Sequence, residues 1–171
     1  MTNARDGQRA KVYDAEQLVR RVFDRADEHG VRALELLGSH ITLPIERRFG
    51  SVESVQIYVD KVLALNWVRA QWERASVVVS VRARAGERAA HYENATATIA
   101  VPLHSSGSAW ALRELVVLHE IAHHLEPVDS GFAPHGPEFV ERYLELVSEI
   151  IGGEAGFLLR TTMLECGVRV G

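Results

Sequence analysis

Residues 119–124 read HEIAHH, which places two histidines four positions apart with a glutamate beside the first. On a helix, His119 and His123 lie one turn apart on the same face, so their rings can bind one metal ion. Imidazole nitrogens are good zinc ligands, and a catalytic zinc site needs only three protein ligands and a water. Glu120, about 100° around the helix, could accept the proton of that water. The segment therefore predicts a hydrolytic zinc site, with a solvated helix face as the alternative.

A third ligand is sought beyond the loop that follows this motif. His135 comes after EPVDSGFAP, whose Pro, Gly and Asp content predicts a loop, and before GPEFVERYLEL, which predicts a helix start. A turn of the chain can therefore return His135 to the metal, and it is our first choice. Asp129, within the loop, is a weaker candidate. A glutamate of the next helix is the main competitor, but Glu141 and Glu145 are out of register with the motif. His124 points about 100° away from His123, so we expect it to pack or to face water.

Other polar side chains could assist such a site. The oxyanion needs a donor besides the metal, and the sequence does not choose among His91, Tyr92, His104, Arg142 and Tyr143. For each of these the alternative is a structural role. Glu126 and Asp129 could hydrogen-bond the outer nitrogens of the ligand histidines, with solvent exposure as the alternative.

Two helices and one or two short strands are predicted in the first part of the chain. Asp14 and Gln17 can cap a helix whose apolar residues recur at helical spacing as far as Gly30. VRALELLG and ITLP predict short strands. Ser51 can start the second helix, over VESVQIYVDKVLAL.

A small mixed sheet is predicted between residues 76 and 103. SVVVSVRAR predicts a strand, AGER a turn, and AAHYE a strand that returns as its partner. TATIAVPL predicts a further strand that ends at Pro102. Its place just before the metal helix suggests an edge strand that could bind an extended substrate through backbone hydrogen bonds. The sheet-bearing half of the chain is thus about residues 31–103.

Helices account for the rest of the chain. The first, which carries the metal motif, is predicted over 109–125 with Ser108 as its N-cap. The second is predicted over 137–151, with Pro137 in its first turn and two glycines after its end. The third spans roughly residues 154–166. The metal-site helices therefore occupy about residues 109–151.

Length and composition favour one soluble domain. The chain has 171 residues, of which 47% are hydrophobic and 25% charged, as in globular proteins. We find no signal-peptide pattern and no membrane span, so a cytoplasmic protein is expected. The single cysteine, Cys166, excludes thiolate zinc sites and intrachain disulfides. Residues 114–154 hold nine acidic side chains and one arginine, which suits a divalent cation.

The sequence also resembles a known family. LHEIAHHL followed by HGPEF is similar to the SprT-like zinc metallopeptidases, which carry H-E-x-x-H on one helix and a third His in an H-G-x-x-F segment on the next. RELVVLHEIAHHL and HGPEF also resemble a group of small bacterial metallohydrolases. The likeness spans about residues 110–146.

The resemblance implies a single α+β zincin-like domain over residues 1–171, in which a small mixed sheet with an edge strand packs on the H-E-x-x-H helix. It implies one zinc ion per chain on three histidines, with Glu120 as the general base. The implied metal ligands are His119, His123 and His135.

We therefore expect a zinc-dependent peptidase that acts on proteins or peptides. One alternative is a regulatory peptidase with a single protein partner. Another is a non-enzymatic binding domain that zinc stabilises, whose basic segment 61–90 contacts nucleic acid. Many SprT-like proteins carry a cysteine zinc ribbon that this chain lacks, so the family's link to DNA-crosslinked proteins is not carried over.

Overall fold

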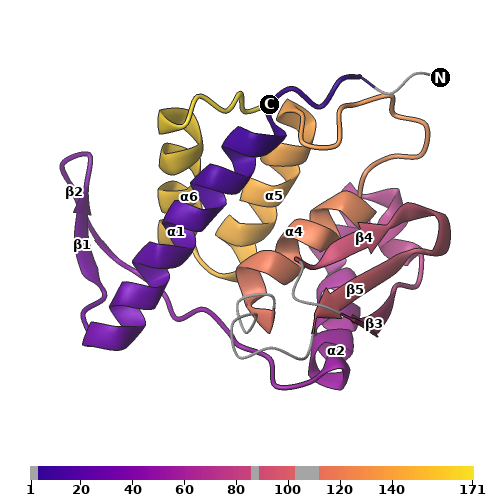
Figure 1. The fold of residues 1–171 in the computed structure, drawn as a ribbon, viewed down its shortest axis with the longest axis horizontal. Coiled ribbons are helices and arrows are strands. Elements are labelled where there is room, and N and C mark those ends of the chain that lie inside the picture. Colours follow the sequence, from indigo (N-terminus) through magenta and orange to yellow (C-terminus); the bar gives the residue numbers. More distant parts are fainter. Residues whose placement is uncertain (1–3, 86–88, 103–111) are drawn as a thin grey trace. The chain divides into compact units, whose positions relative to one another are not determined.

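The computed structural model describes residues 4–85, 89–102 and 112–171. Within these ranges the chain forms six α-helices, two 3-10 helices and five strands (Figure 1). The α+β class predicted from the sequence is thereby confirmed. The chain divides into two compact units, one made of Met1–Glu46 and Gly131–Gly171 and the other of Arg47–Ser130. The single zincin-like domain stays a prediction.

The first unit consists of three helices and a β-hairpin. Its elements are α1 (Arg9–His29), β1 (Ala33–Leu36), β2 (Ser39–Thr42), α5 (Pro137–Ile150) and α6 (Gly153–Glu165). Helix α6 packs against both α1 and α5 (Figure 1). Strands β1 and β2 pair antiparallel across a turn in which Leu37 and Gly38 both have positive φ, as a two-residue hairpin turn requires.

Helix α1 begins earlier than the sequence predicted. The proposed cap at Asp14 and Gln17 is wrong, because the helix already starts at Arg9. Val12 is fully buried and continues the apolar spacing one turn further toward the N-terminus. The predicted end is confirmed, since Gly30 adopts the left-handed conformation after the last helical residue.

The second unit contains the sheet and the metal helix. Its elements are α2 (Val52–Leu63), α3 (Asn66–Gln71), η1 (Glu73–Ser76), β3 (Ser80–Arg84), β4 (His91–Glu93), η2 (Asn94–Thr96), β5 (Thr98–Pro102) and α4 (Glu114–His124). The predicted start of α2 is confirmed: Ser51 caps it in a reciprocal capping box with Ser54. Helix α2 packs beside β3, and α4 packs beside β4.

Strand β5 is the central strand of the sheet, not an edge. The order is β3-β5-β4, with β5 parallel to β3 and antiparallel to β4. The predicted pairing of β3 with β4 is therefore wrong, as is substrate binding along the edge of β5. The run of residues Thr98–Pro102 is buried throughout, which is typical of a strand covered on both faces. Among the described residues, β4 is the edge strand that lies against α4.

The helices of the metal motif lie close to their predicted positions. Helix α4 starts at Glu114 rather than at residue 109, and the proposed cap Ser108 lies outside the described residues. All residues from Glu114 to Ala122 are buried, so α4 is surrounded on every side. Helix α5 begins with Pro137 in its first turn, as predicted.

Candidate metal centre

The start of α4 is fixed by a buried carboxylate. Glu114 is fully buried and accepts hydrogen bonds from Tyr58 Oη at 2.6 Å, Arg47 Nη1 at 2.8 Å and the Arg47 backbone N–H at 3.0 Å. The hydrogen bond and the charge of Glu114 raise the pKa of Arg47 above its ordinary value. These bonds fix the register of α4 within its unit, five residues before the first histidine of the motif.

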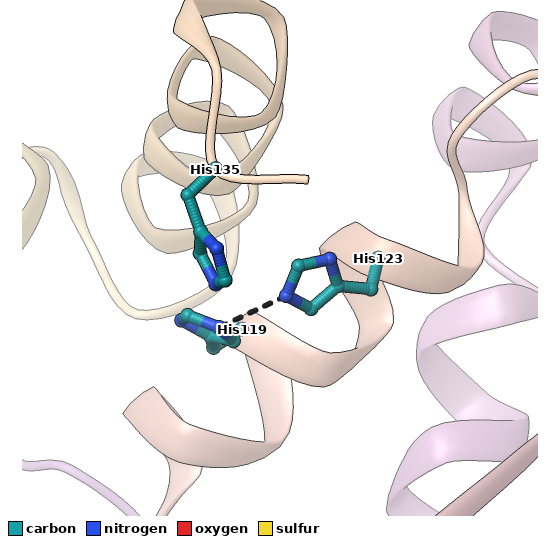
Figure 2. A group of neighbouring side chains, drawn as sticks. All are labelled: His119, His123 and His135. Carbon is teal, nitrogen blue, oxygen red and sulfur yellow. Dashed lines mark hydrogen bonds between the residues drawn. The ribbon is translucent and has the colours of Figure 1, made fainter. Parts of the chain in front are cut away.

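Helix geometry brings His119 and His123 together. Their ring centroids are 4.9 Å apart, and their Nε2 atoms are 3.1 Å apart (Figure 2). Two imidazoles that bind one tetrahedral zinc at about 2.0–2.1 Å have nitrogens roughly 3.3 Å apart. The pair therefore already has the spacing that a shared metal ion requires.

His135 lies immediately before α5. Gly136 follows it as the N-cap, where a Cβ would meet the carbonyl oxygen of Ala133 at 3.1 Å. A residue with a side chain would therefore be crowded at this entry to the helix. The His135 side chain is buried, and its Nδ1 lies 2.8 Å from Oδ2 of Asp6.

The three histidines form a group that suits a metal ion. One ligand nitrogen from each of His119, His123 and His135 lies within 4.8 Å of the others (Figure 2). His119 and His135 are buried, and His123 is partly exposed. Neutral imidazoles are suitable zinc ligands. The donor set therefore fits a metal ion, while the identity of the metal stays a prediction.

Asp129, the loop candidate for the third ligand, does not join this group. Among the described residues, the group of candidate ligands contains only the three histidines. Asp129 is exposed and has a φ of 55°, and Glu126 accepts a hydrogen bond from Ser130 Oγ at 2.5 Å. Glu120 is buried on α4, as predicted for a residue of the motif, and its role as general base stays a prediction.

His124 packs inside its unit, one of the two outcomes expected for it. Its Nδ1 lies 2.9 Å from Tyr92 Oη, and its Nε2 lies 2.9 Å from the backbone oxygen of Arg74. The guanidinium of Arg74 donates to the His124 backbone oxygen at 2.7 Å and to Tyr92 Oη at 3.0 Å. Burial lowers the pKa of His124 to about 4, so the ring is neutral. This network fixes the end of α4.

Two of the candidate oxyanion donors, His91 and Tyr92, have partners within their own unit. Tyr92 belongs to the His124 network, and His91 lies 2.7 Å from Arg84 Nη1 and 3.0 Å from Glu93 Oε1. Tyr143 is buried on α5, where burial and then the charge of Glu16 raise the pKa of its hydroxyl. His104 lies outside the described residues, and Arg142 is buried on α5. Catalytic roles for these five residues stay predictions.

Comparison with known proteins finds no match of the chain to a protein-family model, to a curated protein or to a solved structure. In the part of the chain that the structure describes, every helix is too short or too polar to span a membrane. The function is therefore inferred from the geometry and chemistry of the three histidines.

Proposed function

We propose that this protein is a zinc-dependent hydrolase, and more narrowly a peptidase, with His119, His123 and His135 as the metal ligands. The observation that carries the proposal is the grouping of three imidazole nitrogens within 4.8 Å. Two of these nitrogens come from an H-E-x-x-H segment that forms a helix. In that motif the glutamate beside the first ligand commonly serves as general base.

The size of the ligand group favours a catalytic site over a structural one. Structural zinc sites are closed by four protein ligands, whereas catalytic sites keep one position for water or substrate. Among the described residues the group stops at three, and Asp129 is not part of it. This supports the hydrolase over a domain that zinc only stabilises.

In the proposed reaction, a bound zinc ion would act as a Lewis acid and make a water molecule more acidic. The Glu120 carboxylate would accept a proton from the water as the water oxygen attacks the peptide carbonyl. Glu120 would then return that proton to the amide nitrogen as the carbon–nitrogen bond breaks. The three histidines would keep their neutral form and orient the site.

The basic segment 61–90 gives little support to a nucleic-acid function. Arg74 is bound to His124 and Tyr92, Arg82 pairs with Glu93, and Arg84 binds the backbone oxygen of Ala89. These arginines therefore already have partners within their own unit. A relation to the SprT-like peptidases remains a hypothesis that rests on LHEIAHHL and HGPEF alone.

The proposal is tested by zinc content and cleavage of an unstructured protein such as casein. We expect about one zinc per wild-type chain, little in His135→Ala, and full zinc in Glu120→Gln. Glu120→Gln should lower kcat/KM by about 100-fold or more. His40→Ala and Glu28→Gln, both at exposed positions, are the controls.

Three outcomes separate the alternatives. A wild-type protein without metal, or His135→Ala with full zinc content, would contradict the proposed centre. Zinc binding without casein cleavage would favour the regulatory peptidase or the binding domain. Cleavage that survives in Glu120→Gln would exclude this residue as the general base.

A further inference from the structure

The segment before α1 carries the carboxylate of Asp6, and hydrogen bonds of the residues on either side fix the backbone of this segment. The backbone N–H of Ala4 donates to Gly131 O at 3.4 Å. The Gln8 side chain donates to Arg169 O at 3.1 Å and accepts from Arg169 N at 3.0 Å. Asp6 lies between these two anchored residues. The segment can therefore hold the Asp6 side chain in one place rather than leave it as a free N-terminal arm.

This carboxylate binds the His135 ring on one side. Asp6 Oδ2 lies 2.8 Å from Nδ1 of His135, although the two residues are 129 positions apart in the sequence. An ionised carboxylate can only accept a hydrogen bond, so Nδ1 must carry the proton. In a neutral imidazole the lone pair is then on Nε2. Nε2 is thereby the atom that His135 can offer to a metal.

Two aromatic side chains fix the plane of the same ring. The ring centroids of Tyr13, on α1, and of Phe139, on α5, lie 5.2 and 5.1 Å from that of His135. Both contacts are tilted or edge-on, at 55° and 71°. Phe139 is stacked in turn on Tyr143, which is almost fully buried. The ring of His135 is therefore held in orientation as well as in tautomer.

Asp6 binds His135 through only one of its two carboxylate oxygens. Within the described residues, its other oxygen, Oδ1, is buried and has no hydrogen-bond partner. A buried acceptor without a partner loses hydration and gains nothing in return. This cost is understandable if the one bond to His135 has a function.

We propose that Asp6 is a positioning residue of the metal centre, which holds His135 as the Nδ1–H tautomer so that Nε2 is the ligand atom. The proposal rests on the three-histidine centre of the proposed function. Carboxylates that bind the outer nitrogen of a metal-ligating histidine raise its basicity and restrict its rotation. Asp6 would thus act through His135, without touching metal or substrate.

The first test is zinc affinity, measured by competition with a chromophoric chelator. We expect Asp6→Asn and Asp6→Ala to bind zinc about 10- to 100-fold more weakly than wild type. Asp6→Glu should restore part of the affinity, and Asp14→Asn, at an exposed position on α1, should leave it unchanged. Circular dichroism of the metal-free variants checks that they are folded. Unchanged affinity in folded Asp6→Asn and Asp6→Ala would overturn the proposal.

The second test reads the tautomer of His135 in metal-free protein by nitrogen-15 NMR. We expect wild type to carry the proton on Nδ1 and Asp6→Ala, which has no side-chain acceptor, to lose this preference. A proton on Nε2 in wild type would overturn the proposal, even if no variant folds. If wild type binds no zinc, the proposed function fails, but the tautomer comparison still decides whether Asp6 sets the state of His135.

Discussion

The two regions that carry the ligands, α4 and the segment just before α5, are held in different ways. On α4, the spacing of His119 and His123 comes from the helix itself, and buried hydrogen bonds fix its two ends through Glu114 and His124. His135 precedes α5, and its ring is set by Asp6, which is 129 positions away in the sequence. One region places its ligands by local geometry, while the other uses a contact between distant parts of the chain.

Because of this difference, we expect substitutions in the two regions to change different quantities: the free energy of unfolding in one and the zinc affinity in the other. Substitutions at the ends of α4 remove buried hydrogen bonds that hold the fold of the second unit, so their main effect should be on the free energy of unfolding. Substitutions around His135 change a single bond to a ligand, so their main effect should be on zinc affinity. A variant at an end of α4 that changes only zinc affinity, or a variant near His135 that changes only stability, would contradict this distinction.

The largest effect on stability is expected for Glu114→Ala. The change leaves Tyr58 Oη and the Arg47 backbone N–H, which bind the buried carboxylate at 2.6 and 3.0 Å, without their acceptor. We expect the free energy of unfolding to fall by about 3 kcal/mol in urea titrations. Glu53→Ala, an exposed first-turn glutamate on α2, is the control and should cost less than about 1 kcal/mol. Equal losses in both variants would show that the Glu114 bonds do not stabilise α4.

A smaller effect is expected for Tyr92→Phe. This change removes the hydroxyl that lies between Arg74 and His124 while it keeps the aromatic ring. We expect a loss of about 1.5 kcal/mol in the free energy of unfolding. Zinc affinity should change by less than in Asp6→Asn. A tenfold loss of zinc affinity with unchanged stability would instead make Tyr92 part of the metal centre.

Local signals predicted much of the fold. Ser51 predicts the start of α2 because its hydroxyl can cap the first turn, and Gly30 predicts the end of α1 because glycine adopts a positive φ at little cost. Strand order was not predictable in the same way. The position of β5 between β3 and β4 depends on which strands pair at long range, and sequence proximity suggested the wrong partner.

The residues of the candidate site also differ in whether local sequence or a distant contact determines them. His119, Glu120 and His123 follow from one motif, and His135 follows from the loop and helix start that flank it. Asp6 gave no signal, since a single aspartate before a helix is common and its partner is 129 positions away. The sequence did hold one unused signal for the sheet: the nearly continuous apolar run TIAVP in β5 is typical of a central strand that is buried on both faces. The sequence did not decide whether His124 packs or faces water, because its partners Tyr92 and Arg74 are also distant in sequence.

X-ray absorption at the zinc edge of the zinc-loaded protein counts the imidazole ligands of the proposed centre. We expect three imidazole nitrogens at about 2.0–2.1 Å and one oxygen ligand, with one imidazole fewer in His135→Ala. Two or fewer imidazoles in wild type, or the same spectrum in His135→Ala, would contradict a centre built from His119, His123 and His135.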